Sequence, residues 1–389
     1  MVVAWLGIAC LLGSCVKMVT STEETAEPVP VSFSTYAQRS TKADASYVAP
    51  GEDFATGAEI GVFGFYHDGN GSTDGSWIGD GATNIPDFMY NQTVTKQSGG
   101  SWSYSPVKYW PNETGSGASS AHVDKLSFWG YYPRIAESAY TTDNTPMYSG
   151  TDAELRFWQS GSTSVAYGNT TSGLPSVTFT QSTDISKQVD LMFTTLDPTK
   201  DLTKPTLNGK VQLTFRHALS LVQFNITSGG ASLPDGAIVT IKTLELTNVA
   251  TKGNCPDPTA SFATVALAET FWTGVGTIDS MTLPAGMSDT NLILMPQELV
   301  ADGSTGHSAV KLSITYDISF PATDDPNDTI TYKDNEAEAW LWSDTGTPYG
   351  VKRWLPGRKY TYNISAGLDV IEFSEVFTDT WATPVEYQL

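Results

Sequence analysis

The sequence predicts an all-β protein built from antiparallel sheets. Short runs in which apolar and polar residues alternate recur along the chain, and clusters of Gly, Asn, Asp and Pro separate them. Tyr, Phe, Trp and Thr, which favour strands, are abundant, and no long stretch has the period of an amphipathic helix. Strands at this close spacing, with turn-rich loops between them, are typical of β-sandwiches.

The length and the charge of the chain limit the number of domains and the kinds of partner that we expect. At 389 residues it is long enough for two domains. It has 42 acidic and 21 basic residues, which give a net charge of −21. Because a nucleic-acid partner requires a basic surface, we expect no nucleic acid to bind, and the charge fits a solvated extracellular surface.

The first expected element is a signal peptide over residues 1–15. Its apolar run has the length of a signal peptide and is short for a bilayer span. It ends in Leu12-Gly13-Ser14-Cys15, which is similar to a lipobox: small residues let a peptidase approach, and the thiol of Cys15 carries a lipid. An ordinary secretory signal with an incidental cysteine is the alternative. The polar residues 16–28 that follow are expected to be a flexible tether.

The first strand is predicted over residues 29–37. Val29, Val31 and Phe33 alternate there with proline and serine, which is the pattern of a strand with one buried face. A basic loop flanked by Ser and Thr follows directly, in a stretch that has few other cations.

The remaining strands fall into two groups, on either side of a boundary predicted between residues 200 and 201. Residues 196–210 contain Pro, Asp and Gly but few apolar residues, which favours a linker. The expected domains are residues 29–200 and 201–389. The strands expected before the linker are 59–66, 125–133, 175–181 and 187–195, and those after it are 211–227, 237–250, 291–299, 309–320 and 359–373.

Several local motifs follow one another in a fixed order along the chain. They are WSYSPVKYWP (102–111) with LSFWGYYP (126–133), QVDLMFTT (188–195) with LTFRHALSLVQFNI (213–226), LILMPQEL (292–299), and RWLPGRKYTYNI (353–364). Each motif alone is an aromatic strand or a turn. In this order, and spread over nearly the whole mature chain, they resemble the fimbrillin family, the type V pilins of anaerobic gut and oral bacteria.

The resemblance implies two transthyretin-like β-sandwich domains in tandem and an unusual maturation. A lipoprotein precursor reaches the outer membrane, where an Arg/Lys-directed surface protease cuts the loop behind the first strand. Carried over to this chain, the cut falls after Arg39 or after Lys42. Loss of the strand leaves a groove that a strand of a neighbouring pilin subunit fills, and repetition builds a cell-surface fimbrium for adhesion. A solvated loop in which both cations are incidental is the alternative.

The donor strand implied by the resemblance lies at the end of the sequence. Val385, Tyr387 and Leu389 alternate there with polar residues, directly behind Pro384. Such a strand would pair an open sheet edge and fill an apolar groove at once, which is β-augmentation. A tail that closes its own sheet is the alternative. The sequence leaves open whether the subunit is a stalk, a tip or an anchor.

Neither an enzyme nor a metal or cofactor site is expected. The histidines have no metal-binding spacing, and the chain has no nucleophile elbow or P-loop. A glycosidase uses two carboxylates but has no fixed sequence motif. The motif search therefore does not exclude this activity in an acid-rich chain. Residues 67–75 resemble a calcium loop, but Thr73 stands where such a loop requires glycine, which favours a surface loop. His217, Asp190 and Cys255 are expected to be structural, with Cys255 an unpaired loop or edge thiol.

The competing function is a lipid-anchored surface glycan-binding protein. Exposed tryptophans stack on sugar rings, and Trp77, Trp158, Trp272 and Trp342 lie in loop-like or ambiguous contexts. A binding module would keep its first strand, whereas a pilin would lose it. The N-terminal residue of the protein extracted from the surface therefore separates the two functions.

Overall fold

The structure, a computed structural model, is nearly all β, which confirms the predicted fold class. In the described part of the chain, the helical elements are the short helix α2 (Val265–Phe271) and the 3-10 turn η2 (Ile185–Lys187), and neither is long and apolar enough to cross a membrane. The structure describes residues 28–37, 54–67, 76–78, 81–111, 124–136, 148, 152–196, 199–205, 209–228, 233–261, 265–275, 278–283, 291–299, 309–323, 325, 327–342, 351–366 and 371–380.

A seven-stranded sheet contains the first strand. Its order is β1 (Phe33–Ala37), β9 (Val211–His217), β8 (Met192–Thr194), β5 (Lys125–Tyr132), β2 (Glu59–His67), β3 (Met89–Lys96) and β4 (Trp102–Ser103). β1 runs parallel to β9, and the other neighbours are antiparallel. The central strands are apolar on both faces: in β2, Val62 enters one buried cluster and Phe63 enters another. Both faces of the sheet are therefore covered.

A three-stranded sheet covers the face that carries Phe63. Its order is β12 (Lys252–Cys255), β7 (Ser176–Thr180) and β6 (Glu154–Trp158). Phe157 of β6 and Phe179 of β7 are buried in the same cluster as Phe63. Aromatic rings dominate this cluster, and several of them meet edge to face, as Phe63 and Phe157 do at 5.8 Å between ring centroids.

Two four-stranded sheets form a sandwich from the C-terminal part of the chain. One has the order β14 (Asn291–Leu294), β10 (Ser220–Ser228), β19 (Arg358–Ala366) and β20 (Ile371–Thr380), and the other has β13 (Ile278–Leu283), β11 (Ile238–Ala250), β16 (Lys311–Pro321) and β17 (Thr329–Trp340). Both contribute to one buried cluster, because Leu, Ile and Tyr side chains alternate along them as in β16. β10 and β19 are parallel. A short ribbon joins β15 (Gln297–Glu298) to β18 (Arg353–Trp354).

Several strands differ from the prediction. Residues 29–37 contain a strand only from Phe33 on, residues 291–299 form β14 and β15 in two different sheets, and residues 359–373 include most of β19 and the start of β20. Residues 211–227, predicted as one strand, form β9 and β10, and the chain turns between them at Ala218 and Leu219, both completely buried. Residues 187–195 contain only the short strand β8, since the turn η2 ends at Lys187, held by Asp184.

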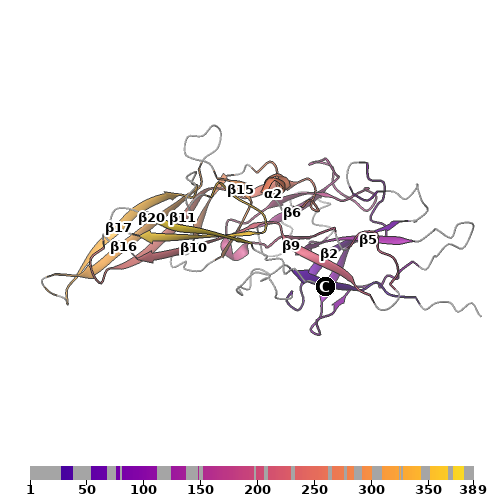
Figure 1. The fold of residues 1–389 in the computed structure, drawn as a ribbon, viewed down its shortest axis with the longest axis horizontal. Helices are drawn as coiled ribbons and strands as arrows, with labels where there is room; N and C mark the ends of the chain where they lie inside the picture. The colour runs from indigo at the N-terminus through magenta and orange to yellow at the C-terminus, as the bar shows by residue number, and fades with distance from the viewer. Residues whose placement is uncertain are drawn as a thin grey trace, which may run out of the picture.

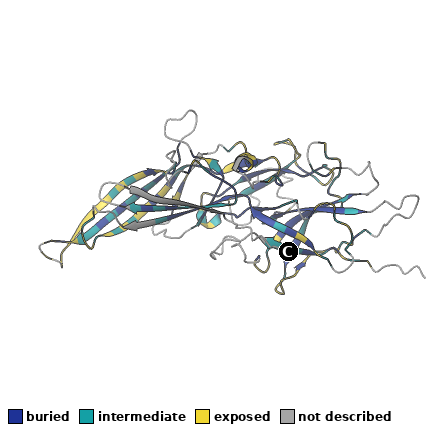
Figure 2. Ribbon diagram, viewed as in Figure 1, coloured by how far each residue is buried: buried dark blue, intermediate teal, exposed yellow. Residues whose placement is uncertain are grey.

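The strand pairing crosses the predicted boundary between residues 200 and 201. β9 and β12 follow it in sequence but pair with β8 and β7, which precede it. Figure 1 shows an elongated molecule with β2, β5 and β9 at one end, β10, β11, β16 and β17 at the other, and β6, α2 and β15 between them. Along β16, buried and half-buried residues alternate, whereas most residues of β17 are exposed (Figure 2). The division into two domains at that boundary stays a prediction.

Candidate functional site

The predicted first strand lies at an edge of the seven-stranded sheet; residues 29–37 are called the first segment below. Its strand β1 pairs in parallel with β9, so that Phe33 lies opposite Val211 and Thr35 lies opposite Leu213. The N–H of Val211 also donates to the carbonyl oxygen of Ser32 over 2.8 Å. The first segment is therefore paired with β9 from Ser32 to Ala37.

The start of the first segment reaches the opposite edge of the same sheet. The N–H of Val31 donates to the carbonyl oxygen of Lys108 over 2.8 Å. The N–H of Trp110 donates to the carbonyl oxygen of Val29 over 2.9 Å. Lys108 and Trp110 follow β4, which is the last strand in the sheet order. The first segment thus bridges the two edges and closes the sheet around a buried cluster.

Two side chains from that opposite edge bind the first segment. The indole Nε1 of Trp102 donates to Oγ1 of Thr35 over 3.0 Å, and the hydroxyl of Tyr104 donates to the carbonyl oxygen of Val31 over 2.7 Å. Burial raises the pKa of Tyr104, so its hydroxyl keeps the proton that this bond needs. Both side chains belong to the motif at 102–111.

The inward side chains of the first segment complete the buried cluster. Val31 and Phe33 are each 2% exposed, whereas Ser32 between them is half-buried. The centroid of the Phe33 ring lies 5.5 Å from that of Phe128, edge to face, and 5.7 Å from that of Tyr104. The alternation that the sequence predicts is confirmed at these positions.

Loss of the first segment would open a groove. Full burial of an apolar side chain of this size contributes about 1.5–3 kcal/mol, so Val31 and Phe33 together contribute about 3–6 kcal/mol. Backbone groups of β9 and of the opposite edge would lose their partners, and unpaired polar groups are costly when buried. The groove would then expose unpaired strand edges and two empty apolar sites.

The structure describes one part of the predicted site. Val29 is half-buried and packs against the same cluster as Val31 and Phe33, so the three predicted strand residues lie together. The other predicted positions lie outside the described residues: the lipidated Cys15, the cut after Arg39 or Lys42, and the donor residues Val385, Tyr387 and Leu389. These remain predictions.

The sequence did not reveal which residues hold the first strand. In the motif at 102–111, Trp110 is 4% exposed, whereas its neighbour Tyr109 is 49% exposed. Trp110 packs against Phe128, with 6.3 Å between the ring centroids, inside the cluster that the first segment closes. The alternation of Trp102 and Tyr104 with serine was a usable signal of a strand, but it does not identify the strand's partner.

Three residues expected to be structural are buried. Nδ1 of His217 lies 2.9 Å from Oδ1 of Asp190, and both side chains are almost completely enclosed. Cys255 is unpaired as expected, but it is buried in β12, where burial raises the pKa of its thiol and makes it unreactive. Within the described ranges, no group of three or more His, Cys, Asp or Glu side chains could hold a metal ion.

The tryptophans considered for sugar binding do not form an exposed platform. Trp77 is 2% exposed and Trp272 is 5% exposed. Trp158 and Trp342 are half-buried, and the indole of Trp158 donates to Oγ1 of Thr178 over 2.8 Å. Stacking on a sugar requires a free ring face, which the first two lack.

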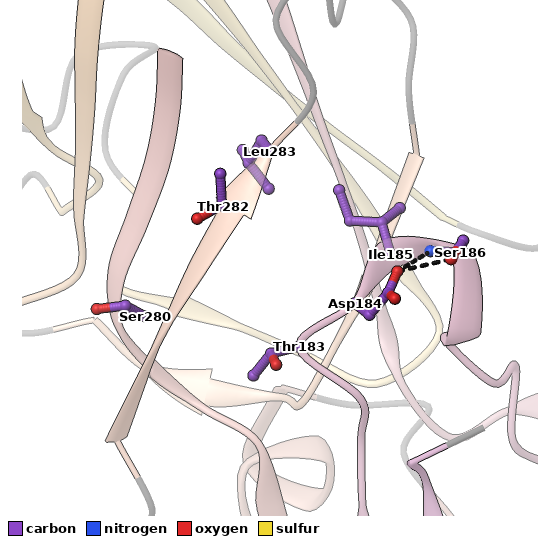
Figure 3. Close-up of a pocket in the computed structure, with 7 residues that line it drawn as sticks. All are labelled: Thr183, Asp184, Ile185, Ser186, Ser280, Thr282 and Leu283. Atoms are coloured by element: carbon purple, nitrogen blue, oxygen red, sulfur yellow. Dashed lines mark hydrogen bonds between the residues drawn. The ribbon is translucent and has the colours of Figure 1, made fainter.

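A pocket of about 620 Å³ lies between η2 and β13 (Figure 3). Its lining consists of Thr183, Asp184, Ile185, Ser186, Ser280, Thr282 and Leu283. Figure 3 shows Asp184 beside Ser186, whose hydroxyl and N–H donate to Oδ1 of Asp184 over 2.6 and 3.0 Å. These bonds lower the pKa of Asp184, and they use its carboxylate to hold the turn. None of the residues predicted for a site lines this pocket.

Comparison with known proteins agrees with the strand architecture. The fimbrium subunit Fim1C of Phocaeicola vulgatus is 23% identical over 345 residues, which cover 82% of this chain and 80% of that protein. The crystal structure of a fimbrial protein from Bacteroides vulgatus has the same fold, with a TM-score of 0.56 and 19% identity over 91% of this chain and 99% of that one. A family model described as fimbrillin-like matches residues 41–381. Because that match covers most of the chain, the chain belongs to the fimbrillin-like family.

Proposed function

We propose that this protein is a structural subunit of a cell-surface fimbrium and that its first strand is temporary. The observation that carries the proposal is the double role of the first segment. It closes the sheet from both edges, yet its only covalent link to β2 runs through the loop that holds Arg39 and Lys42. A cut in that loop detaches the segment and leaves every other strand of the sheet intact.

Export as a lipoprotein places the precursor at the outer membrane. The lipobox-like end of the signal peptide presents Cys15 for lipidation, and residues 16–28 join it to the first segment. The lipid and the first segment therefore lie on the same side of the cut. One cleavage by an Arg/Lys-directed surface protease both opens the groove and frees the subunit from its anchor.

The uncut precursor stays monomeric because the first segment blocks the groove. Both sheet edges that it bridges are paired, so they offer no free edge to another chain. After the cut, only non-covalent contacts hold the segment, and a strand of a neighbouring subunit replaces it as it leaves. The donor residues in this proposal are Val385, Tyr387 and Leu389.

Proteolytic processing of the purified precursor tests this function. An Arg/Lys-directed protease should remove the residues before the cut, as mass spectrometry of the new N-terminus would show, and convert the monomer into polymer in size-exclusion chromatography. The double variant Arg39→Ala/Lys42→Ala should keep its N-terminus and stay monomeric. The two single variants show which residue is cut.

The matched control is Lys125→Ala, which removes a cation at the start of β5 and leaves the loop unchanged. It should be processed and should polymerise as the wild type does. Polymer in equal yield from the uncut double variant would contradict the proposal.

A further inference from the structure

Two lysines border the first segment, one on each edge of the sheet that it bridges. Lys108 follows β4 on one edge, and Lys210 directly precedes β9 on the other. The carbonyl oxygen of Lys108 accepts from the N–H of Val31 over 2.8 Å, and the N–H of Val211 donates to the carbonyl oxygen of Ser32 over 2.8 Å. The peptide bond behind each lysine is therefore bound by the first segment itself.

We propose that the first segment shields two further cleavage sites, Lys108–Tyr109 and Lys210–Val211, from the Arg/Lys-directed protease. A processed subunit whose groove stays empty is cut again at these bonds, whereas a subunit whose groove is filled is not. The inference rests on the proposed function, because it takes the protease and the loss of the first segment from there. It adds a second role for whatever fills the groove, which is to protect the subunit from proteolysis.

The second cut is a hydrolysis, like the first. Water adds across the C–N bond and leaves a carboxylate on the lysine and an amino group on the next residue. Such a protease has to bind the scissile carbonyl oxygen with hydrogen-bond donors of its own. In the intact precursor the carbonyl oxygen of Lys108 is turned toward Val31 instead. At the other bond, the N–H of Val211, which becomes the new amino group, is bound to Ser32.

The stretch around Lys108 depends on the first segment for its place on the sheet. Tyr109 is 49% exposed, and the two backbone bonds to the first segment described above hold this stretch from Lys108 onward. The bonds between Tyr104 and Lys108 lie within the stretch itself, and the bond from Gln92 to the carbonyl oxygen of Ser105 lies three residues earlier. When the first segment leaves, the bond after Lys108 therefore lies in an exposed loop, where proteases preferentially cut.

The stretch behind Lys210 loses its strand partner. Lys210 is exposed, and β9, which follows it, pairs with β1 over residues 211–215. On its other side β9 pairs with β8 from Phe215 on, and a further backbone bond from the chain behind β8 reaches Thr214. Within the described ranges, residues 211–213 therefore have only β1 beside them. Loss of the first segment leaves the bond after Lys210 at the start of an unpaired stretch.

Lysines in other strands are held by pairing that does not involve the first segment. Lys125 begins β5 and lies opposite His67 of β2, and Lys252 begins β12 and lies opposite Thr180 of β7. These pairs stay in place when the first segment leaves. The initial rates of cleavage after Lys125 and Lys252 should therefore not change, and they serve as internal controls.

Limited proteolysis with trypsin, followed by mass spectrometry, tests the shield. In processed wild-type protein, diluted so that it stays monomeric, new N-termini should appear at Tyr109 and Val211. Their initial rates of formation should be at least about tenfold higher than in the uncut variant Arg39→Ala/Lys42→Ala, because cleavage follows the population of the open form. Lys108→Gln and Lys210→Gln each remove one of the two cuts and identify it.

A synthetic peptide of residues 28–37 provides the matched rescue. It contains neither Lys nor Arg, so the protease leaves it intact, and in excess it refills the groove of the processed subunit. Cleavage after Lys108 and Lys210 should slow at least about tenfold. The same peptide with Val31→Asp and Phe33→Asp should give no protection, because the groove would have to bury two unpaired charges.

A variant of the uncut protein tests the shield without the first cut. Phe33→Ala, added to the uncut double variant, leaves a cavity under the first segment and raises the fraction of molecules in which the segment is detached. Cleavage after Lys108 and Lys210 should become at least about tenfold faster than in the double variant alone. Ser34→Ala in the same background changes the outer side of β1 and should leave both rates unchanged.

Each other outcome overturns a stated part of the inference. Loss of the first segment without faster cleavage after Lys108 and Lys210 overturns the shield but leaves the proposed function standing. Faster cleavage after only one of these lysines overturns the shield at the other edge of the sheet. Unchanged rates on addition of Phe33→Ala overturn the shield whatever happens at the first cut. Wild-type protein that is not cut after Arg39 or Lys42 overturns the proposed function itself.

Discussion

At the scale of single residues, Phe33 is the side chain on which the first segment depends most. It is 2% exposed, and it meets Phe128 and Tyr104, which come from two different parts of the sheet. Its neighbour Ser34 faces the other side of the strand and is half-buried. The inner and the outer faces of the same strand should therefore respond differently to truncation.

Phe33→Ala in the uncut precursor should lower the free energy of unfolding by about 3–5 kcal/mol, because the lost ring leaves a cavity in a packed cluster. Ser34→Ala should change it by about 0.5 kcal/mol or less. Denaturant titration followed by tryptophan fluorescence measures both values. Equal effects of the two variants would show that the inner face of β1 is not packed as described.

At the scale of elements, β1 is held by backbone pairing on one side and by side chains on the other. Of the two side-chain hydrogen bonds described above, the one from Trp102 to Thr35 lies nearer the loop in which the cut is proposed. It should therefore slow the loss of the cut segment. A bond of the same kind joins Trp158 to Thr178 between β6 and β7, away from β1.

Trp102→Phe should speed the release of the cut segment about 2- to 10-fold, since one hydrogen bond contributes about 0.5–1.5 kcal/mol. Trp158→Phe loses an equivalent bond elsewhere and should leave the release rate unchanged. Mass spectrometry of the released peptide over time, with excess synthetic peptide of residues 382–389 as competitor, measures both rates. Equal acceleration in both variants would mean that the bond to Thr35 has no specific role.

The sequence predicts the faces of strands better than their partners. The burial of Val31 and Phe33 follows from alternation, which is a local property of the chain. The parallel pairing of β1 with β9 joins segments far apart in sequence, and no local pattern specifies it. The same holds for the bonds from Trp102 and Tyr104, whose motif was visible while its partner was not.

The turn between β9 and β10 could not be predicted for a related reason. It lies at Ala218 and Leu219, which are fully buried, and residues 211–227 contain neither Gly nor Pro. Turn signals mark loops at the surface, whereas this turn lies inside the molecule, where the chain passes from one group of sheets to the other. An apolar sequence without turn residues is therefore predicted as one uninterrupted strand.

At the scale of the whole molecule, residues 16–28 join the proposed lipid on Cys15 to the first segment. A protein anchored by a lipid on Cys15 stays otherwise exposed to water, which suits a chain with a net charge of −21. Cys10 lies in the same apolar run but lacks the Gly-Ser pair that precedes Cys15. It therefore serves as a control for a thiol that is present without the lipobox-like sequence.

Cys15→Ser should abolish the incorporation of labelled palmitate and move the precursor out of the outer-membrane fraction, because serine lacks the thiol that carries the lipid. Cys10→Ser should keep both the label and the location. Metabolic labelling and membrane fractionation of cells that express each variant provide the measurement. Equal labelling of the two variants would point to an ordinary secretory signal.

The passage from β9 to β10 has a mechanical consequence. Each of these two consecutive strands has a parallel partner, which is β1 for β9 and β19 for β10. When a fimbrium of the proposed kind is stretched, the donor in the place of β1 is pulled from its beginning and β9 from its end. The tension then acts along the strands and strains all hydrogen bonds of the pair together, instead of unzipping them in turn. The same shear geometry recurs at β10 and β19, so a polymer without covalent links between subunits would still resist the drag of flowing liquid.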